Sequence, residues 1–119
     1  MLQRFGLAAL LCLSLGQSAF AHAFLKHADP AVGSSVGVLP GELVLTFTED
    51  LEVPFCKVIV TGPDGATAGD APHAVPGHPD EIAIPLTSAG HGSYKVVWHA
   101  VSVDTHHTQG QFTFTVTGG

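Results

Sequence analysis

The chain has 119 residues, of which 45% are hydrophobic and 12% are charged, and its formal net charge is −6. This composition is too apolar and too weakly charged for a disordered tail. Four basic side chains are too few for a nucleic-acid-binding face, and the acidic balance disfavours anionic membrane surfaces. The length suits one domain. Eight histidines point towards metal binding, because imidazole is the commonest metal-ligating side chain.

Residues 1–21 have the three parts of a secretory signal peptide. Arg4 precedes an apolar segment at residues 5–15, and residues 19–21 (AFA) form a small-x-small cleavage signature. The apolar segment is shorter than the ~18–20 residues of a membrane span. We therefore expect cleavage after Ala21, export to the periplasm without membrane insertion, and a mature domain at residues 22–119 that begins with His22. Cleavage after Ala23 is the alternative, and it would remove His22.

The mature chain shows strand patterns and almost no helix pattern. Apolar and polar residues alternate in short segments that are separated by Gly- and Pro-rich turns. The expected strands are residues 24–28, 42–48, 57–61, 81–86, 93–102 and 111–117, with a seventh in residues 32–40 or 66–75 and a loop over the rest of residues 66–80. Phe47, Trp98, Phe112 and Phe114 are the expected core. This spacing predicts an all-β fold, a single-domain Greek-key β-sandwich or barrel of about seven strands.

A candidate metal site follows the expected strand at residues 93–102. Asp104 and His106 are two residues apart, so in an extended chain their side chains point to the same side. They could bind one metal ion or hydrogen-bond to each other, and the spacing leaves both open. A chain that begins at His22 would add an imidazole and an α-amine, whose pKa near ~8 lets a metal displace its proton. Three nitrogens and one oxygen form the tetragonal ligand set that Cu(II) prefers.

Together these segments resemble the CopC family of small periplasmic copper-resistance and copper-carrier proteins, including its YobA-like branch. The resemblance covers residues 22–119 and depends on residues 22–25 (HAFL), 29–34 (DPAVGS), 45–51 (LTFTEDL), 92–98 (GSYKVVW), 100–106 (AVSVDTH) and Gly110 with residues 112–114 (FTF). It implies a cupredoxin-like, Ig-like Greek-key β-sandwich. It also implies one Cu(II) site made from the amine and imidazole of His22 with Asp104 and His106. Glu49 would lie near the copper, as a neighbour or a weak ligand.

The sequence departs from the family in its methionines. Met1 is the only methionine, and it lies in the predicted signal peptide. A methionine-rich Cu(I) site, which some family members have, is therefore excluded, because soft thioether ligands would be needed to select Cu(I).

The remaining histidines and the cysteine of the mature chain have plainer expected roles. His27 is expected to pack or hydrogen-bond, His91 to lie in a turn and His99 at the surface. His107 replaces a proline common in the family and is expected to point away from the ligands. His73 and His78 are expected to be solvated loop residues, or to form an accessory weak Cu(II) or Zn(II) site. Cys56 is expected to be a small buried apolar residue, with a soft copper ligand as the alternative.

The predicted function is binding rather than catalysis. The protein would sequester or carry Cu(II) in the periplasm as a monomer, with a CopD-type inner-membrane protein as the partner that the resemblance suggests. A copper monooxygenase with an N-terminal histidine is disfavoured, because Asp104 would occupy coordination space and the chain has one Trp and one Tyr for stacking on sugars. The residues also leave open a metal-free Ig-like adhesive module and a zinc carrier.

Overall fold

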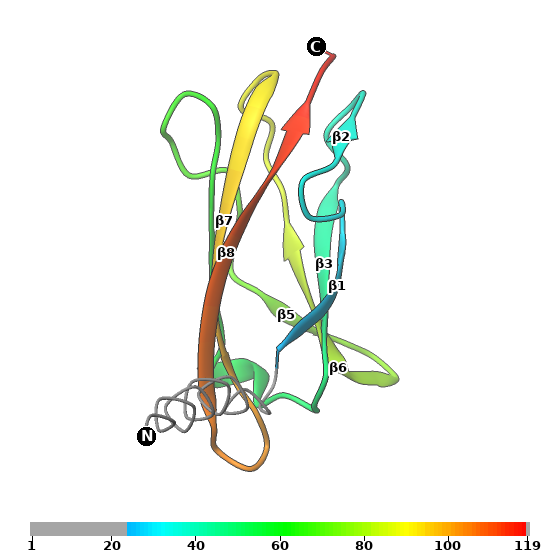
Figure 1. The fold of residues 1–119 in the computed structure, drawn as a ribbon, viewed down its shortest axis with the longest axis vertical. Coiled ribbons are helices and arrows are strands. Elements are labelled where there is room, and N and C mark those ends of the chain that lie inside the picture. Colours follow the sequence, from blue (N-terminus) through cyan, green and yellow to red (C-terminus); the bar gives the residue numbers. More distant parts are fainter. Residues whose placement is uncertain (1–23, 119) are drawn as a thin grey trace, which may run out of the picture.

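Eight strands form two four-stranded sheets in the computed structural model, which describes residues 24–118 (Figure 1). The first sheet has the order β1 (Leu25–Asp29), β3 (Glu42–Phe47), β6 (His78–Pro85) and β5 (His73–Val75). The second has the order β2 (Ser35–Val36), β8 (His107–Val116), β7 (Gly92–Val101) and β4 (Lys57–Thr61). Among these strands, only the β5–β6 and β7–β8 connections stay within one sheet. The predicted all-β Greek-key sandwich is confirmed.

The expected strands all form, and the two uncertain segments each contain one. Residues 32–40 contain β2, and residues 66–75 contain β5. The predicted loop at residues 66–80 is wrong at its end, because β6 already begins at His78, where it pairs with Val75 of β5. Strand β8 likewise begins at His107, opposite Val101 of β7, rather than at residue 111. Both early starts consist mostly of polar residues, so no alternation marks them in the sequence.

The core lies between the sheets and is built by period-2 alternation. Phe47, Trp98, Phe112 and Phe114 are all buried, as predicted. Phe47 of the first sheet meets Trp98 of the second edge to face, with ring centroids 5.1 Å apart. Tyr94 stacks on Phe114 within the second sheet at 5.3 Å. Both geometries are favourable for aromatic rings. The first pair joins the two sheets, and the second joins the strand partners Tyr94 of β7 and Phe114 of β8.

Three further contacts hold β7 in place. The buried Tyr94 hydroxyl donates a hydrogen bond to the Gly90 carbonyl oxygen at 2.6 Å and accepts one from the Ala89 amide at 2.9 Å. Gly110 of β8 lies directly against the Trp98 ring, where a Cβ atom would be 2.6 Å from the ring carbon Cζ2. Close approach without a side chain is a common reason for glycine in a strand. Strand β7 is thus anchored before it reaches the loop that carries the candidate site.

One end of the sandwich gathers the segments that matter for function. The β7–β8 loop, the start of β1 and the 3-10 turn η2 (Val53–Phe55) all lie at the lower end in Figure 1. The chain enters there at Phe24, whose amide donates to Thr48 Oγ1 at 3.0 Å and whose carbonyl oxygen accepts from the Thr48 amide at 3.0 Å. Within residues 24–118, no helix is long and apolar enough to cross a membrane.

Candidate metal centre

Asp104 and His106 come together on a tight turn between β7 and β8. His106 Nδ1 lies 3.1 Å from Asp104 Oδ2. The turn closes through a hydrogen bond from the Thr105 amide to the Ser102 carbonyl oxygen at 2.8 Å and another from the Ser102 amide to the His106 carbonyl oxygen at 3.0 Å. Thr105 has a φ of +69°, so the backbone is not extended there. The predicted neighbourhood of Asp104 and His106 is confirmed, but the extended-chain reasoning behind it is wrong.

Ser102 is the buried anchor of this turn. It is 1% exposed, and its hydroxyl donates a hydrogen bond to Asp104 Oδ1. The same hydroxyl oxygen accepts from the His106 amide at 3.3 Å. This role was not predicted from the sequence, although Ser hydroxyls commonly hydrogen-bond to nearby backbone groups in turns, as this one does to the His106 amide.

The electrostatics of the turn keep Asp104 ionised. The hydrogen bond from the Ser102 hydroxyl lowers the pKa of Asp104, and the hydrogen bond and electrostatic attraction between Asp104 and His106 lower it further. The two side chains remain about half exposed, at 54% for Asp104 and 50% for His106. A carboxylate and an imidazole that are held together and open to solvent can bind a cation. We call Asp104 and His106 with their turn the loop site.

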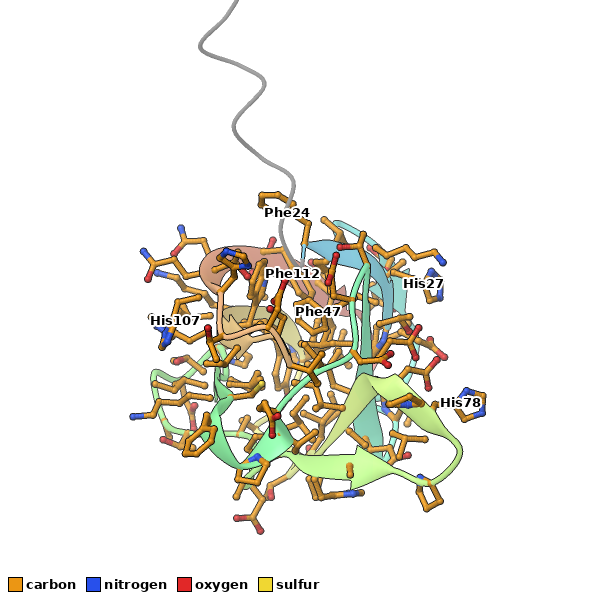
Figure 2. The ribbon with its side chains drawn as sticks, turned by 90° about the horizontal axis from the view of Figure 1, so that it is seen from below. Phe24, His27, Phe47, His78, His107 and Phe112 are labelled. Atoms are coloured by element: carbon orange, nitrogen blue, oxygen red, sulfur yellow. The ribbon has the colours of Figure 1, made fainter. Side chains whose placement is uncertain are left out.

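The predicted ligand His22 lies outside the described residues, as does the predicted signal peptide. The described chain starts two residues later, at Phe24, at the same end as the β7–β8 loop (Figure 1). Figure 2 views this end directly, with Phe24 at the rim of the sandwich.

Glu49 lies in the segment after β3, which contacts both the start of the described chain and the β7–β8 loop. It is half-buried and follows Thr48, which holds Phe24. The next carbonyl oxygen, that of Asp50, accepts a hydrogen bond from the Val103 amide of the β7–β8 loop at 3.0 Å. Glu49 therefore lies between the entry of the chain and the loop site. Its predicted role near a metal remains a prediction.

Cys56 is a buried structural residue. It is 8% exposed, its Sγ accepts a hydrogen bond from the Val101 amide at 3.4 Å, and its thiol lies 3.5 Å from the Glu52 carbonyl oxygen. Burial raises the pKa of the Cys56 thiol. Since the thiolate is the metal-binding form, this environment favours the expected apolar role over copper binding.

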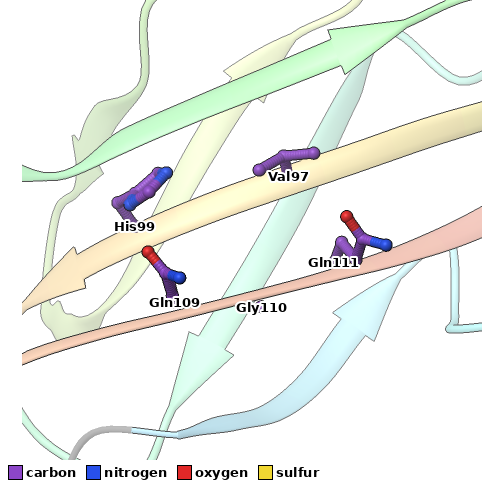
Figure 3. A pocket seen from close by; sticks show the side chains of 5 residues that line it. All are labelled: Val97, His99, Gln109, Gly110 and Gln111. Carbon is purple, nitrogen blue, oxygen red and sulfur yellow. The ribbon is translucent and has the colours of Figure 1, made fainter.

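Several further histidines are exposed on the surface. His99 lies on the outer face of the second sheet, as predicted, beside a hollow lined by Val97, Gln109, Gly110 and Gln111 (Figure 3). His91 is exposed at a bend before β7. His107 is exposed at the start of β8 (Figure 2).

His73 and His78 have carboxylate neighbours. His73 Nε2 lies 4.0 Å from Glu42 Oε2. His78 instead groups with Asp80 and Glu81. Both histidines are exposed, as expected, but they lie on strands β5 and β6 rather than in a loop. The alternative expectation was one accessory metal site shared by the two histidines, and the group of possible metal ligands around His78 does not include His73.

The fold and the loop site together define a small Greek-key β-sandwich protein with a candidate metal-binding turn at one end. The family model for the CopC domain matches residues 25–117. The chain thus belongs to the CopC family, as the sequence motifs predicted.

Individual relatives agree with this assignment. Protein YobA of Escherichia coli K12 is 37% identical over 116 residues, which are 95% of this chain and 93% of YobA. The crystal structure of CopC from Methylosinus trichosporium OB3b matches with a TM-score of 0.76 and 25% identity, over 82% of this chain and 95% of that one. The structure of PcoC, a methionine-rich copper resistance protein from Escherichia coli, matches with a TM-score of 0.67 and 35% identity, over 82% of this chain and all of PcoC.

Proposed function

We propose that the mature protein binds one Cu(II) ion and sequesters or carries copper in the periplasm. The ligands are the amine and imidazole of His22, the carboxylate of Asp104 and the imidazole of His106. The observation that carries the proposal is the 3.1 Å separation of His106 Nδ1 and Asp104 Oδ2. Two ligands that bind one ion at about 2.1 Å in adjacent positions lie about 3 Å apart. The loop site therefore fits two neighbouring ligands of one ion.

The position of Phe24 supports a third and a fourth ligand from His22. Phe24 is hydrogen-bonded to Thr48 through its amide and its carbonyl oxygen. Two residues of extended chain span at most about 7 Å, so a terminus at His22 stays near this end of the sandwich. Glu49, which follows Thr48, would neighbour the ion there.

Copper is supported as the metal by the ligand chemistry and by a relative. Nitrogen and oxygen ligands in a tetragonal set favour Cu(II), which heads the affinity order of divalent first-row metals. The structurally similar PcoC is described as a copper resistance protein. Unlike the methionine-rich PcoC, this chain has Met1 as its only methionine. We therefore propose a Cu(II) site without a thioether Cu(I) site.

Carriage or storage is favoured over catalysis. Four protein ligands would fill the equatorial plane of Cu(II), and closed metal sites are typical of binding rather than reaction, as for zinc. The protein would act as a monomer and exchange copper with a CopD-type inner-membrane protein.

The first test is to express the full precursor with export, measure the intact mass of the mature protein, and titrate it with Cu(II) while recording EPR spectra. We expect a start at His22 and one tight, nitrogen-rich tetragonal Cu(II). A start at Phe24, or a correct start without tight Cu(II), contradicts the proposal and leaves a zinc binder or a metal-free Ig-like module.

Single substitutions locate the copper within the protein. His106→Ala removes a ligand and is expected to raise the Kd for the first Cu(II) at least about tenfold. His107→Ala is the matched control, because this neighbouring exposed imidazole lies outside the proposed ligand set. Equal losses in the two variants would refute the assignment of His106.

A further inference from the structure

The start of β6 carries a second set of metal-ligating side chains. One ligand atom from each of His78, Asp80 and Glu81 lies within 4.8 Å of the others. We call these three residues the β6 cluster. It belongs to the first sheet, whereas the loop site joins two strands of the second. In Figure 2, His78 projects from the opposite side of the molecule to His107, which follows the loop site.

Backbone and side-chain contacts hold the β6 cluster in place. The Pro79 carbonyl oxygen, between His78 and Asp80, accepts a hydrogen bond from the Leu51 amide at 2.9 Å. Thr46 Oγ1 on β3 donates to Glu81 Oε2 at 3.2 Å. A hydrogen bond of this kind orients a ligating carboxylate and is a regular companion of metal ligands. The ligands therefore sit on paired strand rather than on a free loop.

The distances suit a single small ion. Ligands that bind one ion at about 2.1 Å lie about 3 to 4 Å apart. The three ligand atoms lie within 4.8 Å of one another, so binding one ion would require them to approach by about 1 Å at most. His78 is exposed and the two acids are half-buried, so an ion can enter from solvent while Thr46 keeps the Glu81 carboxylate oriented.

The charge balance favours a divalent cation. Asp80 and Glu81 are adjacent carboxylates, and like charges at close range repel. A bound divalent ion would neutralise both. Imidazole suits Cu(II) and Zn(II), and Cu(II) binds more strongly to a nitrogen–oxygen set.

We propose that His78, Asp80 and Glu81 form a second Cu(II) site, separate from the loop site and weaker than it. It is weaker because it offers one nitrogen and no amine–imidazole chelate. Water completes the coordination. The β6 cluster gives the protein a capacity of two Cu(II) ions, and the second ion has ligands that the loop site does not use.

The two sites border the same backbone segment, so the test must resolve individual residues. Leu51 pairs with Pro79 on one side and forms a β-bridge with Ser102 on the other. A global signal such as a thermal shift could therefore report either site. Paramagnetic broadening of backbone amide signals in NMR spectra reports the position of Cu(II) directly.

The experiment uses the mature chain with its start verified by mass. We expect the first equivalent of Cu(II) to broaden the amide signals of residues 102–106. The second equivalent should broaden those of residues 78–81 together with their strand partners Val75 and Thr46. His78→Ala should raise the Kd for the second equivalent at least about tenfold and leave the first unchanged. Glu81→Gln, which keeps the shape of the side chain, should also weaken binding of the second equivalent of Cu(II), while its amide spectrum remains that of a folded protein.

His73→Ala is the matched control, because His73 lies on the partner strand of the same hairpin and has its own carboxylate neighbour, Glu42. This variant should bind the second equivalent as the parent does. Broadening spread evenly over the exposed histidines, or equal losses in His73→Ala and His78→Ala, overturns the β6 site. If the first equivalent of Cu(II) does not broaden the amide signals of residues 102–106, the proposed function is refuted instead. The two results are therefore distinguishable.

Discussion

Replacing Gly110 by Ala tests how tightly the two strands that support the loop site are packed. A Cβ atom at this position would lie 2.6 Å from Trp98 Cζ2, 2.8 Å from Cε2 and 3.0 Å from Nε1. Ordinary contact begins at 3.4 Å, so the indole ring would have to retreat by about 0.8 Å. The indole ring also packs edge to face against Phe47, with ring centroids 5.1 Å apart, and it is 5% exposed. The ring therefore has little room to move.

The magnitude follows from two opposing effects. Overpacking a dense core costs about 1–3 kcal/mol, and this rigid buried ring places Gly110→Ala at the upper end. Replacing glycine by alanine at a permitted backbone angle returns about 0.4–1 kcal/mol through the unfolded state. We expect a net loss of about 2 kcal/mol in the free energy of unfolding. For a domain of this size, that corresponds to a Tm lower by about 8–16 °C.

Urea unfolding followed by tryptophan fluorescence measures this directly, because Trp98 is the only tryptophan. Gly41→Ala is the control, since a Cβ atom there meets nothing within 4 Å, and it should change stability by no more than about 0.5 kcal/mol. If Gly110→Ala unfolds at the same urea concentration as the parent, with unshifted native emission, the close packing of Gly110 on Trp98 is refuted.

Three further outcomes follow from local contacts. Ser102→Ala should raise the pKa of Asp104 in an NMR titration, because it removes the hydroxyl hydrogen bond that lowers this pKa. On acidification, the variant should then lose the stabilisation that the ionised carboxylate gives the turn at a higher pH than the parent does. An unchanged pKa would contradict the role of Ser102. Tyr94→Phe should destabilise the fold by about 1–3 kcal/mol in urea unfolding, because the buried hydroxyl makes two hydrogen bonds; a loss below about 0.5 kcal/mol would argue against this. Cys56 should react with a thiol reagent far more slowly in native protein than in urea, because burial covers it and raises its pKa, and equal rates would mean that it is accessible.

Local alternation was enough to predict most of the fold. In β3, Leu43, Leu45 and Phe47 recur every second residue and are all buried, because successive side chains of a strand point to opposite faces. The starts of β6 and β8 were not predicted, because their residues do not alternate between apolar and polar. Residues 78–80 and 107–110 are mostly polar or small, and pairing with a neighbouring strand, rather than a buried face, makes them part of the sheet.

For the loop site too, the sequence predicted one part and the tertiary structure decided another. Residue chemistry and spacing identified Asp104 and His106 as a pair, because only Thr105 separates them and any short turn or strand keeps such residues close together. Tertiary structure decided how they meet. The buried Ser102 hydroxyl and the left-handed Thr105 shape the turn, and neither effect follows from the two-residue spacing.

The β6 cluster required the fold itself. Alternation along a strand would point His78 and Glu81 to opposite sides, yet their ligand atoms lie within 4.8 Å. Thr46 on β3 and Leu51 beyond it hold this segment from positions about 30 residues away in the chain. Contacts between distant segments depend on sheet order and register, which local patterns do not encode, and these contacts decide which polar side chains become a site.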